Sequence, residues 1–236
     1  MGSEPSHPEL LDWLAVWFRD EAKGSLKELH KLILTSHTWQ QSSLISNKKI
    51  DSTNRLLSHM NRQRLDAEVF RDSLLRLSGR LDLTMGGPGI EQFTKSDGPQ
   101  GAKVLNYDAF DWNSPQAARR TIYRVVWRGI PDPFLEALDF PDLGILAPKR
   151  TASVFSLQSL ALFNNNFVLH SSDWLAARVI KEHSDLDARI NRLIELLWLR
   201  LPTPEEHQLF KTYVQQHDLP ALCRILINSN EFLFIE

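Results

Sequence analysis

The chain has 236 residues with 27 basic and 29 acidic side chains, which gives a formal net charge of −2 at pH 7. Because 42% of the residues are hydrophobic and 24% are charged, the composition is typical of a globular protein and excludes a disordered tail, a collagen-like chain and a coiled coil. The near-neutral charge also argues against a dedicated duplex-binding protein, which would carry a basic footprint, so we predict no nucleic-acid partner.

Cysteine usage and apolar runs exclude several further classes. Cys223 is the only cysteine, so an intramolecular disulfide, haem attachment through a Cys-x-x-Cys-His motif and a zinc site with several thiolates are excluded. No run of about 18 apolar residues is present, which predicts no membrane insertion. The polar start Met1–Glu9 lacks the basic and apolar regions of a signal peptide, so we expect the chain expressed alone to be cytoplasmic.

Helical patterns occupy most of the first 80 residues. Ser6–Glu9 has the pattern of a capping box, with Ser6 as the N-cap residue, and it precedes apolar residues at helical spacing. Ser25–Glu28 is a second such box and predicts the start of another helix. Asn61–Ser78 carries the strongest helical pattern, closed by Gly79. Because a helix pair starts so close to the beginning of the sequence, we expect a module of a longer protein.

Residues 81–150 are predicted to be irregular, with one minor β element. Glycine, proline and asparagine interrupt the sequence from Met85 to about Arg119, and no long periodic segment appears there. The β-branched and aromatic residues of Thr121–Arg128 predict a short strand, and Pro131–Leu138 is predicted to be a short helix. A loop of this length in a compact domain tends to be functional or mobile.

Residues 151–236 are predicted to be helical. Thr203 is the predicted N-cap of a capping box, with Pro204 in the first turn and Glu206 closing the box. Further helices are predicted over Ser156–Phe163, Ser172–Glu182, Asp187–Leu201 and Leu219–Ile227. These patterns predict a mainly α fold. We expect one compact multi-helix domain over residues 1–236, helical in 1–80 and 151–236, with a long irregular middle segment and a minor β element in 81–150.

The densest charged group lies on the helix predicted around residue 68. Glu68, Arg71 and Asp72 lie at spacings of three and four residues, so their side chains share one helix face. We therefore name them as candidate catalytic residues, with Glu68 or Asp72 as a general base and Arg71 beside it. A salt-bridge face with a structural role is the alternative interpretation.

Four loop carboxylates form a candidate calcium site. Ca²⁺ takes about 6–8 oxygen ligands, often from irregular loops, and Asp108, Asp111, Asp139 and Asp142 fall in the irregular middle segment. No EF-hand pattern is present, and loop aspartates also form Asx-turns and helix caps. Calcium is therefore the one candidate cofactor, and turn or cap formation stays an open alternative.

Amides and tryptophans form a candidate ligand-binding site. Asn164, Asn165 and Asn166 interrupt an otherwise apolar helix and, with Gln158, can present hydrogen-bonding groups to a ligand, and of the three we name Asn164 and Asn165 as candidate ligand-binding residues. Trp112 and Trp127 bracket the transition from the loop to the predicted strand. Glycan-binding proteins often combine amides with exposed tryptophans, whose rings have an apolar face and a polar edge. The alternative is that the tryptophans fill the core.

Several strings carry a resemblance to a known family. They are PSHPELLDWLA at 5–15, LDAEVFRD at 65–72 with SGRLD at 78–82, PDPFLEALDFPD at 131–142, LQSLALFNN at 157–165 and NSNEFL at 228–233. In this order they resemble the C-terminal domain of unknown function of planctomycete-type, cytochrome c-associated proteins. The resemblance covers nearly the whole chain. It implies a mostly helical fold and an extracytoplasmic bacterial parent with a cytochrome c-like segment and a further domain upstream, but no reaction.

Two functions stay open on these observations, and whether the chain is an enzyme stays open with them. The first is a ligand- or partner-binding helical module, whose partner is a small molecule, a glycan or the N-terminal domains of the parent protein. The second is a calcium-assisted hydrolase of an ester, lactone or glycosidic bond, in which Glu68 or Asp72 is the base. A purely structural module, docked through its apolar first helix, is a third possibility.

Overall fold

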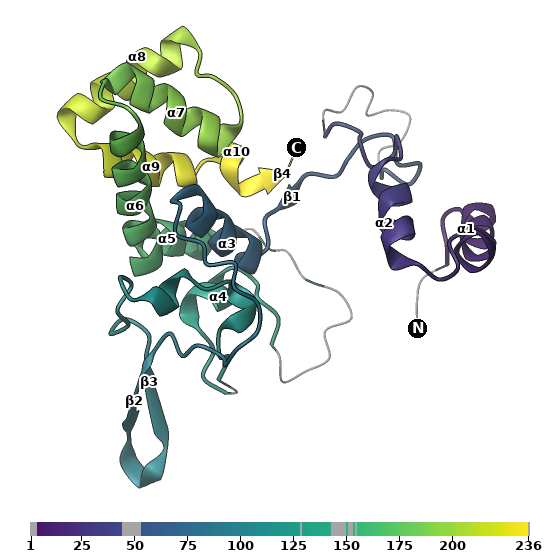
Figure 1. The fold of residues 1–236 in the computed structure, drawn as a ribbon, viewed down its shortest axis with the longest axis horizontal. Helices are drawn as coiled ribbons and strands as arrows, with labels where there is room; N and C mark the ends of the chain where they lie inside the picture. The colour runs from purple at the N-terminus through teal and green to yellow at the C-terminus, as the bar shows by residue number, and fades with distance from the viewer. Residues whose placement is uncertain are drawn as a thin grey trace. The chain divides into compact units, whose positions relative to one another are not determined.

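The computed structural model describes residues 4–43, 53–127, 129–142, 150, 153 and 155–235. They form two compact units, of which unit 1 ends at Gln63 and unit 2 spans Arg64–Ile235 (Figure 1). The single domain predicted over residues 1–236 stays a prediction. Within the described ranges, no helix is long and apolar enough to cross a membrane.

The predicted fold class, mainly α with a minor β element, is confirmed. The described part of the chain contains ten α-helices and only two-stranded sheets. Unit 1 holds α1 (Pro8–Asp20) and α2 (Leu26–Leu34). Unit 2 holds α3 (Ala67–Leu77), α4 (Pro133–Ala137), α5 (Ser156–Asn164), α6 (Asn166–Glu182), α7 (Leu186–Trp198), α8 (Pro204–Gln216), α9 (Leu219–Ile227) and α10 (Asn230–Leu233). The strands are β1 (Gln63–Arg64), β2 (Thr94–Asp97), β3 (Lys103–Asn106) and β4 (Phe234–Ile235).

The two helices of unit 1 begin with different caps. Ser25 is the N-cap of α2, as predicted, and its hydroxyl accepts a hydrogen bond from the Glu28 N–H at 3.4 Å. The N-cap role predicted for Ser6 is wrong, because α1 starts at Pro8 with His7 at the N-cap position. The Ser6 hydroxyl is hydrogen-bonded to His7 Nδ1 at 2.9 Å instead. The helix itself lies where the apolar pattern predicted it.

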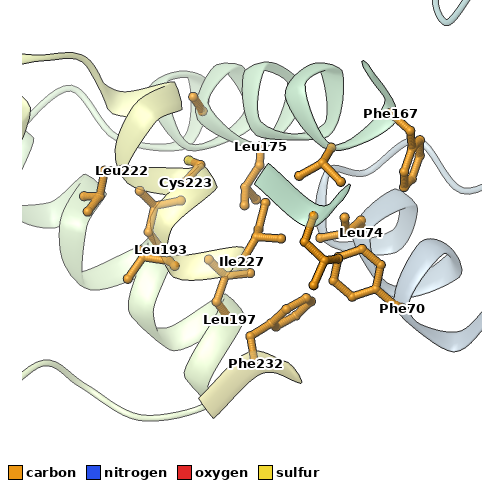
Figure 2. Packing of buried hydrophobic residues seen from close by; sticks show 14 of the residues in the cluster. Phe70, Leu74, Phe167, Leu175, Leu193, Leu197, Leu222, Cys223, Ile227 and Phe232 are labelled. Carbon is orange, nitrogen blue, oxygen red and sulfur yellow. The ribbon is translucent and has the colours of Figure 1, made fainter. Parts of the chain in front are cut away.

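The core of unit 2 is apolar and lies mainly where α6 packs against α9. Figure 2 shows side chains of α3, α6, α7, α9 and α10 meeting in this core. The ring of Phe70 contacts two other rings of this core, since its centroid lies 6.1 Å from that of Phe134 and 5.8 Å from that of Phe232. Cys223 is fully buried, and burial raises the pKa of its thiol, so this group is held neutral and unreactive.

Helix α8 begins at the predicted capping box. The Thr203 hydroxyl accepts from the Glu206 N–H at 3.3 Å, Glu206 Oε2 accepts from the Thr203 N–H at 2.8 Å, and Pro204 is the first helical residue. The Arg200 guanidinium donates to Glu206 at 2.7 Å and to Glu231 of α10 at 3.0 Å. These contacts join the start of α8 to α10.

Helices α4 and α7 start within two residues of the predicted position, at Pro133 and Leu186, whereas α3 and α6 start six residues away from it. Helix α3 starts later, at Ala67, because Gln63–Arg64 is extended in strand β1. Helix α6 starts earlier, at Asn166, because Asn165 is its N-cap and Oδ1 of this residue accepts from the Phe167 N–H at 2.9 Å. The amides that interrupt the apolar pattern thus serve, in part, to start a helix.

The strand predicted over Thr121–Arg128 is wrong. Thr121–Tyr123 forms a 3₁₀ turn, and the extended residues that follow contribute only an isolated bridge between Arg124 and Ile90. Residue 128 lies outside the described residues. β-branched and aromatic residues favour extended backbone, but a strand also needs a neighbour along its length, and here the neighbouring segment pairs at a single residue.

The longest β element is an antiparallel hairpin formed by β2 and β3, with Thr94 opposite Asn106 and Asp97 opposite Lys103. It extends away from the helices of unit 2 (Figure 1). Nearly all of its side chains are exposed. Because no face of the hairpin is buried, its sequence lacks the alternation of apolar and polar residues by which strands are predicted.

Candidate functional site

Unit 2 contains a cavity of about 390 Å³, which lies within the usual size range of small-molecule sites. Its lining comes from α3, the segment before β2, β3 with the loop that follows it, the start of α4 and the start of α6. The polar lining side chains include Arg71, Gln92, Tyr107, Asp108, Trp112, Arg124, Asp132, Asn165 and Asn166.

Aromatic rings form the apolar part of the lining. The ring centroid of Phe167, at the start of α6, lies 5.5 Å from that of Trp112 and 6.0 Å from that of Phe134. Phe167 and Phe134 are buried. The three rings therefore give the cavity a fixed apolar wall, since a buried aromatic cluster has little freedom to rearrange.

Arg71 of α3 is fully buried and is held by hydrogen bonds to a loop. Its Nη1 donates to the Arg119 carbonyl at 2.9 Å and to the Thr121 hydroxyl at 3.2 Å, and its Nη2 donates to the Ala117 carbonyl at 2.9 Å. A guanidinium has five N–H donors in a planar arrangement, so it can join several carbonyls of one loop at once. Arg71 thus fixes this loop against α3.

The surroundings of Arg71 disfavour its charge. Burial, and after it the charge of Arg124, lower the pKa of Arg71, and the opposing effects of Asp72 and Asp132 do not compensate. The Arg71 guanidinium carbon also lies 5.2 Å from the centroid of the Phe167 ring, which contributes a favourable cation–π contact. The cation is therefore positioned firmly, and its charge is disfavoured mainly by burial.

Arg124 and Asp132 form a buried ion pair in the same lining, with side chains that are 6% and 13% exposed. Asp132 is also the N-cap of α4, because its Oδ1 accepts from the Phe134 N–H at 2.9 Å and from the Leu135 N–H at 3.1 Å. Both oxygens of Asp132 are therefore occupied. Nε of Arg124 is buried and has no hydrogen-bond partner among the described residues.

Gln92 is 1% exposed, and neither its Nε2 nor its Oε1 has a hydrogen-bond partner within the described part of the chain. Its position is set by Ile90, two residues earlier. The Ile90 N–H donates to the Tyr123 carbonyl at 2.7 Å, and the Ile90 carbonyl accepts from the Val125 N–H at 2.9 Å. These two bonds hold the segment of Gln92 beside the segment that carries Arg124.

Two further donors in the lining have no acceptor within the described ranges, namely Nε1 of Trp112 and Nε of Arg71. Buried polar groups in native proteins are nearly always hydrogen-bonded, and each exception calls for an explanation such as a bound ligand or water. With Gln92 and Arg124, four side chains that carry unpartnered buried atoms line one cavity. This concentration makes the cavity the candidate functional site.

Partnered polar groups complete the lining. Nδ2 of Asn166 donates to Oδ1 of Asp108 at 3.4 Å, and Asn165 caps α6. The Tyr107 hydroxyl donates to the Ile130 carbonyl at 3.0 Å, and burial raises the pKa of this hydroxyl. Tyr107 is therefore a neutral group that is used structurally.

Four of the predicted site residues line the cavity, and they come from three different predicted sites. They are Arg71 from the candidate catalytic group, Trp112 and Asn165 from the candidate ligand site, and Asp108 from the candidate calcium site.

The two candidate general bases are held by donors and cations. Oδ1 of Asp72 accepts from the Thr121 N–H at 2.8 Å and from the Thr121 hydroxyl at 2.7 Å, and Oδ2 accepts from Nε of Arg120 at 3.3 Å. Glu68 is ion-paired with Arg150. Neither carboxylate is among the described residues that line the cavity.

Asp139 and Gln158 meet in a separate polar cluster. Oδ2 of Asp139 accepts from Nη2 of Arg64 at 2.7 Å and from Nε2 of Gln158 at 3.1 Å, and Oδ1 accepts from the Ser153 hydroxyl at 2.6 Å. Partial burial acts to raise the pKa of Asp139, but hydrogen bonds from Ser153 and the charge of Arg64 outweigh it, so the pKa is lowered. The carboxylate is thereby kept ionised by donors of the protein itself.

The remaining predicted residues lie apart from the cavity. Asp111 accepts from the Asn113 N–H at 2.9 Å in an Asx-turn, Asn164 is exposed at the end of α5, and Trp127 and Asp142 line a second cleft of about 300 Å³. Across the part of the chain that the structure describes, no three His, Cys, Asp or Glu side chains come together in a group that could hold a metal ion.

Sequence reasoning missed five polar residues of the lining: Gln92, Asn106, Tyr107, Arg124 and Asp132. For Asp132, the sequence does hold a signal, since an aspartate before a proline that starts an apolar helical pattern is a typical N-cap. Gln92, Asn106 and Tyr107 lie in the segment without periodicity, where nothing in the sequence marks them, and Arg124 lies in the segment predicted to be a strand, where no site was expected.

A family model described as PSD1, a protein of unknown function (DUF1553), matches residues 1–214. The chain belongs to this family. The resemblance to a domain of unknown function is thus confirmed at that level, and every lining residue named above lies within the match. Neither a curated protein nor a solved structure matches the chain. Because membership of the PSD1 family implies no reaction, function has to be argued from the cavity.

Proposed function

We propose that this PSD1-family chain binds a small polar molecule in the cavity of unit 2. Gln92 carries the proposal, because it is a buried amide in the cavity lining whose Nε2 and Oε1 have no hydrogen-bond partner in the described part of the chain. Leaving a buried polar group unsatisfied costs about 1–3 kcal/mol. A ligand that supplies a donor and an acceptor to Gln92 would remove this cost.

The chemistry of the lining agrees with a ligand of this kind. Small-molecule sites combine apolar and aromatic walls with a few placed polar groups. Here Phe134 and Phe167 supply the apolar wall, and Gln92 and Trp112 supply the directed polar contacts. Of the predicted ligand-binding residues, Trp112 and Asn165 take part in this proposal.

The alternative of a calcium-assisted hydrolase has less support. Its candidate bases lie outside the cavity lining: Asp72 accepts hydrogen bonds from Thr121, and Glu68 is paired with Arg150 through Oε1, while its buried Oε2 has no hydrogen-bond partner among the described residues. Of its four candidate calcium ligands, Asp139 is bound by donors of the protein and Asp111 closes a turn. We therefore propose binding and assign no reaction.

The proposal can be tested by nuclear magnetic resonance with defined probes: benzoate, benzamide, glucuronate, glucuronamide, glucose and N-acetylglucosamine, each at millimolar concentration. A probe in the cavity should shift the side-chain amide signals of Gln92 and the indole signal of Trp112. The indole signal of Trp198 is the internal control, because its N–H donates to the Ser229 hydroxyl at 2.7 Å in another part of unit 2. If no probe shifts the Gln92 and Trp112 signals, the proposal is refuted.

We also propose that the chain is the C-terminal module of a larger extracytoplasmic bacterial protein of planctomycete type, with a cytochrome c-like segment upstream, whose other domains are partners of this one. The ordered strings described above support this. An immunoblot of fractionated source cells should then show a band larger than this chain in the periplasmic fraction. A band of the chain's own size confined to the cytoplasm would contradict it.

A further inference from the structure

The unpartnered atoms around the cavity are mostly hydrogen-bond donors. Nε of Arg71, Nε of Arg124, Nε1 of Trp112 and Nε2 of Gln92 lack acceptors, whereas Oε1 of Gln92 is the one unpartnered buried acceptor in the described lining. A complementary ligand must therefore carry acceptor oxygens. Hydrogen bonds in which one partner is ionised are about twice as strong as bonds between neutral groups, so the neutral donors of Gln92 and Trp112 gain most from an ionised acceptor, which favours an anion.

The charges of the lining limit the ligand to a single negative charge. Two guanidinium groups, Arg71 and Arg124, lie in the lining with two carboxylates, Asp108 and Asp132. Asp132 is buried against Arg124, while Asp108 is exposed. Asp72 also lies beside Arg71, with Oδ1 3.5 Å from Nη1, so the opposing charges around the cavity are already balanced and one added negative charge can be met only by the N–H groups that have no acceptor among the described residues. A second negative charge would be repelled by Asp132.

From these observations we infer that the cavity binds a small monocarboxylate with a ring or apolar body, in preference to the uncharged amide of the same shape. The carboxylate oxygens accept from the unpartnered N–H groups, and the body lies against Phe134 and Phe167. This inference rests on the proposed function, and it adds the chemical class of the ligand.

Two isosteric pairs of probes test the inference: benzoate with benzamide, and glucuronate with glucuronamide. Titration of the full chain at pH 7 should give at least about tenfold tighter binding for one carboxylate than for its amide. If an amide binds as tightly as its carboxylate, the inference is overturned while the proposed function stands. If inorganic phosphate binds as tightly as the better carboxylate, the monocarboxylate preference is also overturned. If no probe binds, both proposals fail.

Two variants connect the preference to the cavity. Gln92→Glu places a carboxylate beside the bound one, so it should weaken benzoate at least about tenfold and benzamide much less. Gln208→Glu is the matched control, because Gln208 is exposed on α8 and outside the lining, and benzoate affinity should stay within about twofold of the original.

Trp112→Phe keeps an aromatic ring in the wall and removes the indole donor together with part of the ring area, so it serves if Gln92→Glu does not fold. It should weaken benzoate several-fold. The inference would be overturned if both variants fold and neither changes the affinity for benzoate. If Gln92→Glu does not fold, unchanged benzoate affinity in Trp112→Phe alone would overturn it.

Discussion

Replacing Asp72 with asparagine should destabilise the protein, because this carboxylate ties α3 to the loop that begins at Thr121. The substitution Asp72→Asn keeps the size of the side chain and removes its charge and one acceptor oxygen. In the structure, Oδ1 accepts two hydrogen bonds from Thr121, and Oδ2 accepts one from Arg120. Oδ1 also lies 3.5 Å from Nη1 of Arg71.

The expected magnitude follows from these contacts. Hydrogen bonds to a charged acceptor contribute about 1.5–3 kcal/mol, against about 0.5–1.5 kcal/mol for neutral pairs. The two bonds from Thr121 therefore each lose about 1 kcal/mol when the acceptor becomes neutral. The asparagine NH₂ must also point at Arg120 or Arg71, which adds a smaller loss. We expect the free energy of unfolding to fall by about 2–3 kcal/mol.

Urea denaturation followed by circular dichroism measures this change, and Glu68→Gln on the same helix is the matched control. Glu68 pairs with Arg150, whose side chain is 44% exposed, so loss of the pair should cost at most about 1 kcal/mol. The reasoning is refuted if Asp72→Asn changes the free energy of unfolding by less than about 0.5 kcal/mol, or if both variants lose the same amount.

Three further predictions follow from single contacts. The hydrogen bond from Arg200 lowers the pKa of Glu206 from 4.5 to about 2, although burial acts to raise it. The contribution of Glu206 to stability is therefore present above pH 4.5 and is lost as the pH falls toward 2. Glu206→Gln should therefore lower the free energy of unfolding by about 1 kcal/mol at pH 7, after allowance for solvent screening, and by little at pH 2. Urea denaturation at both pH values measures this, and an equal loss at both would contradict the prediction. Gly79 has a φ of +74°, so Gly79→Ala should cost about 1 kcal/mol in thermal denaturation, and no loss would mean that α3 ends differently. Gln92→Met removes two unpartnered polar atoms and should stabilise the ligand-free protein by about 1 kcal/mol; a loss of stability would show that Gln92 has partners.

Two helix starts that depend on local chemistry, at Ser25 and Thr203, could be predicted from the sequence, whereas the same pattern at Ser6 placed the N-cap of α1 one residue too early. At Ser25 and Thr203, the cap, the glutamate three residues later and the apolar pattern lie within a few residues of one another, so tertiary contacts are not needed. The start of α6 was missed for a related reason. Asn165 was interpreted as a ligand group, whereas its Oδ1 caps the helix, and the same short polar side chain suits both roles.

The cavity could not be predicted, because tertiary pairing of irregular segments assembles it. Gln92 and Arg124 lie far apart in the sequence and come together through two backbone hydrogen bonds of Ile90. Backbone bonds between single residues leave no periodic pattern of side chains, and such a pattern is the main signal for structure in a sequence. The spacing of charged residues makes Arg71 a candidate site residue, but its hydrogen-bond partners are two backbone carbonyls and the Thr121 hydroxyl, which no sequence motif identifies.

The roles of the aspartates in the middle segment could not be predicted from the sequence either. The aspartates predicted to bind calcium and Asp132, which was not among them, occupy similar irregular positions in the sequence. In the structure Asp132 caps α4 and pairs with Arg124, whereas Asp139 binds Arg64 and Ser153. Which donor reaches a carboxylate decides its role, and that depends on the fold rather than on the residue type.

Arg71 connects the stability of unit 2 to its proposed binding function. Because its terminal nitrogens are bound to the carbonyls of Ala117 and Arg119, the guanidinium is held in place before a ligand arrives, while its buried Nε–H has no acceptor among the described residues. The same bonds make Arg71 a poor residue with which to test binding, since its removal would leave buried acceptors unpaired and unfold a large part of the unit. Gln92 and Trp112 are the informative positions, because the described fold makes no use of their side-chain polar atoms.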